Sequence, residues 1–191
     1  MKTRVLLIIC ILAASGGILS AQKVNVINKG DSYLKVGIGT TVTPNIGYWS
    51  HKVIGYPLNG PIDYLSIMVP FSISNGIYSF GKSSSLSLGG NFMYALFPGK
   101  QSNKGELNAE PASTFYVAPE LLYHYTLINA CWEIYGGASF GYLFGVSEKS
   151  WGGAFSYKIA LGSTYYFNQK FGIYAELGFP YSASVGIAIK W

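Results

Sequence analysis

Along most of the chain after residue 32, apolar and polar residues alternate with a period of two. The pattern is clearest at the end, where Ala183, Val185, Ile187, Ile189 and Trp191 interleave with small or polar residues. Successive side chains of a β-strand point to opposite faces, so each such segment predicts a strand with one apolar and one polar face. Eight segments show this period: 33–42, 69–78, 85–96, 114–127, 132–142, 155–167, 171–179 and 183–191.

The connections between these strands differ in length in an alternating way. An even number of antiparallel strands lets one chain close into an up-and-down barrel, with short turns at one end and longer loops at the other. The connection at 180–181 is the exception, being short on the side of the long loops. Region 43–68 is long enough for one more hairpin, which would make ten strands. The short connections are 79–82, 129–130 and 168–170, and the long ones are 43–66, 98–112 and 145–152.

The composition indicates the environment in which such a barrel would lie. Half of the residues are hydrophobic, 16% are aromatic and only 11% are charged, whereas a soluble domain has about 25% charged residues. No segment beyond the first 21 residues has the run of about 20 apolar residues that a membrane helix needs. Hydrophobicity spread over alternating strands therefore predicts an all-β, antiparallel, eight-stranded transmembrane β-barrel.

A soluble, lipocalin-like barrel would also alternate over eight strands. In that fold the polar face would meet water and would carry charges. The polar faces here consist mostly of glycine, alanine and serine, which favours a tightly filled lumen over a solvated exterior.

The first 21 residues predict export. Met1 to Arg4 include two basic residues, the apolar run 5–14 follows, and Ala21 is a small residue suited to cleavage. A retained anchor is disfavoured because 15–17 interrupt the apolar run. Cys10 does not fit a lipoprotein, because bulky residues precede it. The sequence thus predicts a signal peptide at 1–21 and a barrel domain at 22–191.

The charged residues and cysteines of the mature chain exclude several functions. Removing 1–21 leaves 11 basic and 8 acidic residues, a net charge of +3, with scattered lysines and no arginine. This is not a nucleic-acid footprint. Cys131 alone remains, so no internal disulfide can form. The sequence contains no metal-ligand cluster, phosphate loop or nucleotide fingerprint, so no cofactor is expected.

The C-terminal residues resemble a known signal. The segment 184–191, a polar residue followed by glycine and then by alternating hydrophobics ending on an aromatic, resembles the terminal recognition signal of outer-membrane β-barrel proteins. The strand 171–179 with its inward Glu176 resembles the penultimate strand of the small barrels of this family. The resemblance implies the barrel-insertion machinery and outer-membrane lipid as partners. The residues that carry the signal are Ser184, Gly186, Ile189 and Trp191.

The polar faces place a balanced set of charges inside the barrel. Because eight strands enclose a space only wide enough for side chains, inward charges must be paired. We expect a structural network that plugs the lumen, with Glu176 paired to Lys158 or Lys190; a proton or solute path is the alternative. The expected network is Lys35, Glu120, His124, Glu133, Lys158, Glu176 and Lys190.

Catalysis is a further alternative, because some barrels of this size modify lipids with a serine and a histidine. The candidates are Ser50 and His51 in the first long loop, with Asp63 as the acidic partner. A nucleophile needs a base within hydrogen-bond reach, and adjacency in a loop does not provide that geometry. His124 faces inward and is assigned to the lumen network.

The long loops carry the remaining features. Tyr48, Trp49 and Tyr56 cluster in the first loop, where aromatic side chains would form an interfacial girdle or contact a ligand, a sugar or another protein. The second loop is charged, with Lys100, Lys104, Glu106 and Glu110.

Taken together, the sequence predicts a monomeric, non-enzymatic barrel of the bacterial outer membrane. Its role would be structural, or it would interact with partners at the cell surface. A narrow channel for small or apolar solutes is the alternative.

The order of basic, apolar and small residues at the N-terminus makes a direct prediction. Mass spectrometry of the protein isolated from cell envelopes should find Gln22 as the first residue. Finding Met1 on the mature protein would contradict cleavage.

Overall fold

The structure of the chain is a computed structural model. The structure describes residues 27–41, 66–97, 100–101, 107–109, 112–127, 131–147, 151–179 and 182–191. The expected signal peptide and most of the first long loop lie outside these ranges.

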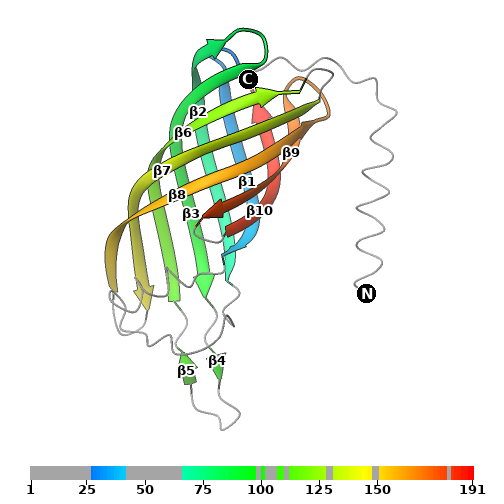
Figure 1. Cartoon of the computed structure of the whole chain (residues 1–191). Helices are drawn as coiled ribbons and strands as arrows, with labels where there is room; N and C mark the ends of the chain where they lie inside the picture. The colour runs from blue at the N-terminus through cyan, green and yellow to red at the C-terminus, as the bar shows by residue number, and fades with distance from the viewer. Residues whose placement is uncertain are drawn as a thin grey trace, which may run out of the picture.

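Eight strands form one closed antiparallel barrel (Figure 1). Each strand pairs with its neighbours in the chain, and β10 pairs with β1 to close the wall, with Gly186 opposite Gly37. Because β1 pairs directly with β2, no further hairpin is inserted between them, and the ten-stranded alternative is wrong. The barrel strands are β1 (Ser32–Thr41), β2 (Ile67–Phe80), β3 (Ser84–Phe97), β6 (Ala112–Thr126), β7 (Trp132–Ser147), β8 (Trp151–Tyr166), β9 (Phe171–Phe179) and β10 (Ser182–Lys190).

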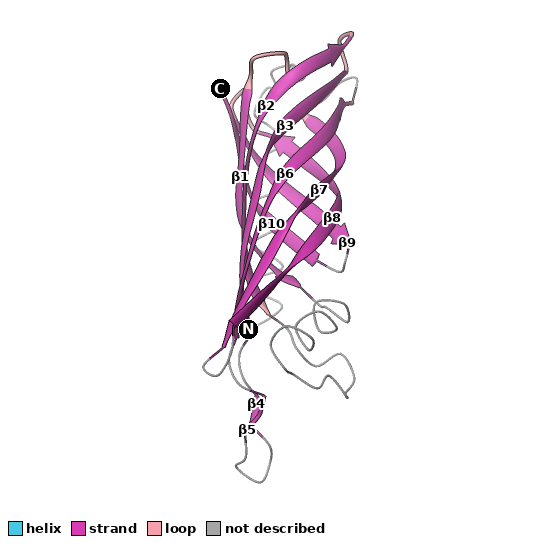
Figure 2. Cartoon of the chain, turned by 90° about the vertical axis from the view of Figure 1, so that its left-hand side faces the viewer, coloured by secondary structure: helices cyan, strands magenta, loops and turns pink. Residues whose placement is uncertain are grey.

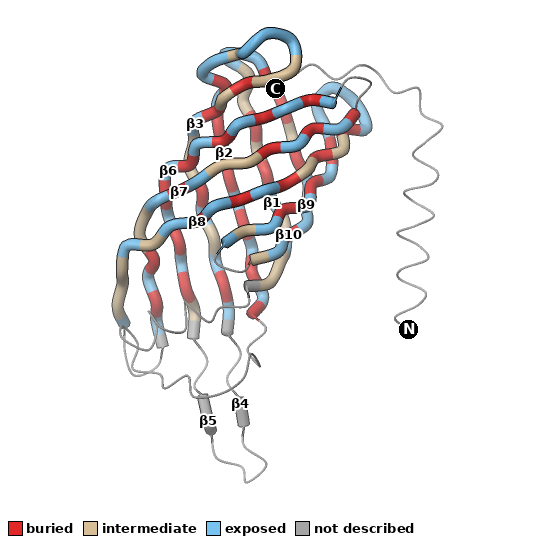
Figure 3. The backbone as a smooth tube through the Cα atoms, viewed as in Figure 1, coloured by how far each residue is buried: buried red, intermediate tan, exposed pale blue. Residues whose placement is uncertain are grey.

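The alternation seen in the sequence is the alternation of inside and outside. Along β9, apolar residues from Phe171 to Phe179 are exposed, while Gly172, Tyr174 and Glu176 between them are buried. The same two-residue period of buried and exposed positions runs along the other barrel strands (Figure 3). The apolar face therefore points outward and the small and polar face points into the lumen, as expected for a barrel surrounded by lipid.

Two prolines interrupt the ladders without breaking the barrel. The pairing of β1 with β2 skips the positions opposite Pro70, and the pairing of β6 with β7 skips Pro119. Proline has no N–H to donate, so each gap costs a ladder bond on one side only. Pro70 still faces Met93, and Pro119 faces Gly90.

Glycines allow large side chains to cross the lumen. A Cβ on Gly37 or on Gly186 would overlap Tyr174, whose ring lies over both. In the same way, a Cβ on Gly162 would overlap the ring of Tyr135. Tyrosine on one strand thus fills the space left by glycine on the next, which is how so narrow an interior can be packed.

The two ends of the barrel differ. At one end, β2 and β3 are joined by 81–83 and β8 and β9 by 167–170, and Gly81 takes a positive φ of 71°. Backbone hydrogen bonds join Ser32 to Trp191, so the first and last strand ends meet here. Figure 2 shows the C-terminus at this end, opposite β4 and β5.

At the other end, one expected long loop is short. The segment 145–152 was expected to be a loop, but Gly145 pairs with Gly152 and Val146 pairs with Trp151. The β7–β8 hairpin therefore extends further than the alternation indicated. Glycine gives no alternation signal, yet it joins a ladder whose register neighbouring residues have already set.

The second long loop contains structure of its own. β4 (Lys100–Gln101) and β5 (Leu107–Ala109) pair to form a separate two-stranded sheet. The other charged residues expected in this loop lie outside the described residues. Among the described residues, no helix is long and apolar enough to cross a membrane.

Candidate functional site

The lumen is the first place to look for a site, because the polar side chains gather there. All seven residues expected in the network are buried, none more than a tenth exposed. They do not form one chain of ion pairs. They belong to separate clusters at different depths of the barrel, in which neutral side chains take a large part.

The central cluster surrounds Glu176 of β9. Its carboxylate accepts hydrogen bonds from the Nζ atoms of Lys35 at 2.7 Å and Lys158 at 2.5 Å. The hydroxyl of Tyr135 donates a third bond, at 3.0 Å. Lys35 also lies 4.2 Å from the centre of the Tyr135 ring. Because the partners come from β1, β7 and β8, this one carboxylate ties together several sides of the lumen.

The pairing of Glu176 was only half anticipated. Lys158 was one of the two expected partners, whereas Lys35 is the second partner found. Lys190 lies six residues beyond Ser184, the β10 residue opposite Glu176. Lys190 instead faces Tyr33 across the β1–β10 seam, at the end with the short turns.

A second cluster is a linear chain through His124. Ser87 Oγ lies 2.8 Å from Nε2 of His124, and Glu133 Oε1 lies 2.9 Å from Nδ1. The ring of Tyr33 contacts the imidazole edge to face, with centroids 5.5 Å apart. The carboxylate of Glu133 accepts a hydrogen bond from the Nδ1–H of His124, which fixes the ring in one orientation.

Glu120 forms a third cluster with neutral partners. Ser72 Oγ and Asn91 Nδ2 each donate to its carboxylate at 2.7 Å. Further towards the long loops, Tyr116 and Ser139 are hydrogen-bonded at 3.0 Å. Beside them, Ala118 and Leu143 pack with Tyr116, and Met93 packs against this group.

The end of the lumen with the short turns is filled by apolar and aromatic side chains. Ile27, which precedes β1, is fully buried and packs with Tyr33, Tyr166, Tyr174 and Ala188. Backbone bonds hold the preceding segment against β2: Gly30 donates to Gly76 at 2.9 Å, and Gly76 donates to Asp31 at 2.8 Å. The described part of the chain thus closes this end with its own N-terminal residues.

The chain Ser87–His124–Glu133 has the bonding order of a nucleophile, a base and an orienting carboxylate. Both Ser87 and His124 are completely buried, and the clusters above and below occupy the lumen. A substrate would have to displace that packing, so we assign these three residues a structural role in filling the lumen. The loop candidates Ser50, His51 and Asp63 lie outside the described residues.

Sequence reasoning identified the charged residues of the lumen but missed their neutral partners. Ser72, Ser87 and Asn91 carry no signal beyond lying on the polar face of a strand. Tyr33 and Tyr135 could have been predicted to face the lumen by the same alternation, because each lies two residues from an inward charged residue, Lys35 and Glu133 respectively. Among the described residues, no group of three histidine, cysteine or acidic side chains could hold a metal ion.

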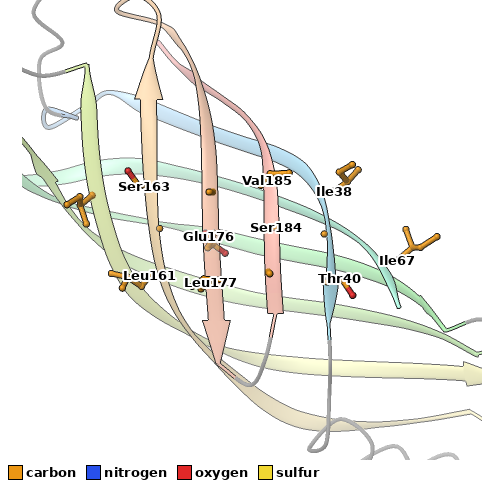
Figure 4. A pocket seen from close by; sticks show the side chains of 14 residues that line it. Ile38, Thr40, Ile67, Leu161, Ser163, Glu176, Leu177, Ser184 and Val185 are labelled. Atoms are coloured by element: carbon orange, nitrogen blue, oxygen red, sulfur yellow. The ribbon is translucent and has the colours of Figure 1, made fainter. Parts of the chain in front are cut away.

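An apolar concavity of about 820 Å³ lies on the wall formed by β1, β8, β9 and β10 (Figure 4). Its apolar side chains, such as Ile38, Leu161 and Val185, are on the exposed face of their strands. Glu176 contributes to the lining, but its carboxylate is bonded within the lumen. The concavity therefore suits a hydrocarbon surface and offers no catalytic group.

The residues of the expected assembly signal lie along the closing seam. Ser184 is buried beside Glu176, and Gly186 faces Gly37 of β1. Trp191 is 55% exposed, and its backbone exchanges hydrogen bonds with Ser32. The indole is therefore free to contact lipid or another protein, while the backbone of this residue closes the barrel.

Comparison with known proteins shows the fold. The chain matches no protein-family model and no curated protein. It is similar to the attachment invasion locus protein Ail of Yersinia pestis, solved in complex with the heparin analogue sucrose octasulfate, at 14% identity over 85% of this chain and 99% of that chain, with a TM-score of 0.50.

A second solved structure is similar to the same extent. The outer-membrane protein OprG from Pseudomonas aeruginosa is 11% identical over 86% of this chain and 97% of that chain, with a TM-score of 0.50. The chain thus has the fold of the small outer-membrane β-barrel proteins of bacteria.

The Glu176 cluster predicts a large loss of stability for Glu176→Ala. The change leaves the ammonium groups of Lys35 and Lys158 buried without their anion, which should cost about 3 kcal/mol of unfolding free energy. Unfolding in urea, followed in detergent micelles, measures it. The matched control is the triple variant Lys35→Met, Lys158→Met and Glu176→Leu, which removes all three charges and should stay close to the wild type. Equal midpoints for the wild type and Glu176→Ala would contradict the pairing.

Proposed function

We propose that this protein is a bacterial outer-membrane barrel with a plugged lumen, exported by a cleaved signal peptide, that acts as a structural or surface-interaction protein. The observation that carries the proposal is the filling of the lumen. Glu176 and its two lysines span the middle, His124 and Glu133 fill a second level, and Ile27 fills the end with the short turns.

The location is supported by the outward face of the barrel. Large apolar side chains cover it on every strand, and exposed aromatic pairs lie at different levels, such as Trp132 with Tyr165 near the short turns and Phe140 with Phe155 nearer the long loops. In water such a surface would aggregate, whereas in a bilayer it is what lipid requires. Short turns would face the periplasm and the long loops the outside.

A surface role is favoured over transport and catalysis by what the lumen offers. A transported solute would have to break buried ion pairs, and these cost several kcal/mol to separate. Ser87, the serine hydrogen-bonded to His124, is completely buried, so a substrate cannot reach it without displacing its neighbours. The same fold occurs in Ail, a protein named for attachment and invasion, so a barrel of this size is compatible with a role in surface contacts. We expect the protein to act as a monomer in outer-membrane lipid.

Conductance tests the plug. Refolded mature protein in a planar lipid bilayer should give no step-like currents above the leak of the bare bilayer. As a positive control, Tyr135→Ala combined with Tyr166→Ala removes two large lumen side chains and should raise the leak. Discrete currents from the wild type would favour the alternative, a narrow channel for small solutes.

The C-terminal resemblance gives a separate prediction about assembly. Because the backbone of Trp191 pairs with Ser32, Trp191→Ala keeps the seam closed and removes only the exposed indole. The variant should refold in detergent like the wild type, while its amount in the outer membrane of cells falls sharply. Fractionation and heat-modifiable gel mobility measure both quantities. Wild-type levels in the membrane would show that the insertion machinery does not need the indole.

A further inference from the structure

Within the part of the chain that the structure describes, one half of β8 has a neighbouring strand on one side only. β8 pairs with β7 along its length, beginning with Trp151 opposite Val146, but its ladder with β9 begins at Ile159, opposite Phe179. The hairpin ends there, because β9 stops at Phe179 and β10 starts at Ser182. Within the described residues, the first half of β8 is therefore an open sheet edge beside a short hairpin (Figure 1).

The register shows which backbone groups point to the open side. Tyr166 donates its N–H to Cys131, on the β7 side, whereas Phe167 donates to Phe171, on the β9 side. Backbone groups of successive residues point to opposite sides of a strand. Odd-numbered residues of β8 therefore direct their N–H and C=O away from β7. In the open half these residues are Trp151, Gly153, Phe155 and Tyr157.

This edge lacks the devices that normally protect one. Natural proteins cover an open edge, or place charges or proline on it. Residues 151–157 contain neither a charge nor a proline. Trp151 is 82% exposed and Phe155 is 68% exposed, the two highest values among the large hydrophobic side chains described. An apolar edge whose backbone groups have no partner strand among the described residues is a template for another strand.

The position of the edge follows from its aromatic residues and rests on the proposed location in the outer membrane. Phe155 stacks on Phe140 with centroids 5.7 Å apart, and Tyr157 lies 6.2 Å from Phe179. Aromatic belts mark the boundary between lipid and water. The edge therefore begins at the outer interface and continues towards water, with Trp151 at its far end, where a partner outside the cell can reach it.

Two simple occupants do not fit the edge. A hydrocarbon chain could cover the aromatic side chains, but it cannot hydrogen-bond to the N–H and C=O groups. A second copy in the same membrane would be related by a twofold axis along the membrane normal. Strands in such barrels tilt by about 35–45°, so two β8 edges brought together in this way would cross at roughly 70–90° and could not form a ladder.

We propose that the open half of β8 binds an extended segment of another protein by β-strand addition. The segment lies antiparallel to β8 and in line with β9, so that it continues an existing ladder. It carries no proline and no charge where it pairs. Alternate apolar side chains pack beside Trp151 and Phe155, while its main chain supplies the hydrogen bonds.

The first test uses defined peptides and the full mature protein in nanodiscs. The probe is a short acetylated peptide of alternating valine and serine. N-methylation of alternate amides on one edge removes the hydrogen bonds to β8, whereas N-methylation on the other edge leaves them. The first peptide should bind roughly tenfold or more weakly than the second, because about two hydrogen bonds are lost. Equal binding of the two methylated peptides would overturn the proposal.

Amide hydrogen exchange locates the binding. On adding the unmethylated peptide, exchange should slow at Trp151, Gly153, Phe155 and Tyr157, while the even-numbered residues, already bonded to β7, should not change. Protection of the odd-numbered amides before peptide is added would show that the protein covers this edge itself, and would overturn the proposal. The conductance of the same sample is independent of this outcome, so failure here leaves the plugged lumen unaffected.

A pair of variants separates the backbone from the side chain. Phe155→Pro and Phe155→Ala both lose the ring, but only the first loses the N–H that faces the open side. Proline is tolerated on a strand edge, so both variants should keep the heat-modifiable mobility of a folded barrel. Phe155→Pro should bind the peptide several-fold more weakly than Phe155→Ala. Equal binding by the two folded variants would contradict strand addition.

Discussion

Closing eight strands into one wall leaves an interior only as wide as side chains, and most of the structure follows from this constraint. An inward side chain must be small, must pack against a neighbouring strand, or must hydrogen-bond to a residue on another strand. The glycines at 37, 162 and 186 leave room for Tyr135 and Tyr174, and the buried lysines reach one shared carboxylate at Glu176. The lumen is thus the core of this protein, built from polar groups because lipid takes the apolar face.

The period of two predicted this fold because it records directly which face of each strand meets lipid. It predicted the eight strands, their order and the burial of all seven charged or titratable residues of the lumen. It failed where glycine removes the signal, as at Gly145 and Gly152, where a loop was expected and the hairpin continues. The short sheet of β4 and β5 follows from no alternation in the sequence.

The partners inside the lumen could not be predicted for a different reason. The alternation along a strand predicts that a residue points inward, but which inward residues meet depends on strand register and on the curvature of the wall. Lys35 and Glu176 are 141 positions apart in the chain and meet inside the lumen, although β10 lies between their strands. Neutral partners such as Ser87 and Asn91 resemble any other small polar residue on an inward face. At such sites the sequence shows which residue types face inward, whereas the contacts between them can be known only from the closed barrel.

Within the described residues, the wall departs from regular pairing along the first half of β8. Over most of the wall, small or polar groups face the lumen and large apolar groups face outward, so local pattern and overall fold agree. Beside the short β9–β10 hairpin, β8 continues alone, and its backbone groups and the exposed Trp151 and Phe155 gain nothing within the described barrel. A lumen filled with buried side chains leaves little room for a solute. The open edge, in contrast, leaves backbone N–H and C=O groups of β8 without a partner strand in the described barrel, and a partner strand would supply their hydrogen bonds.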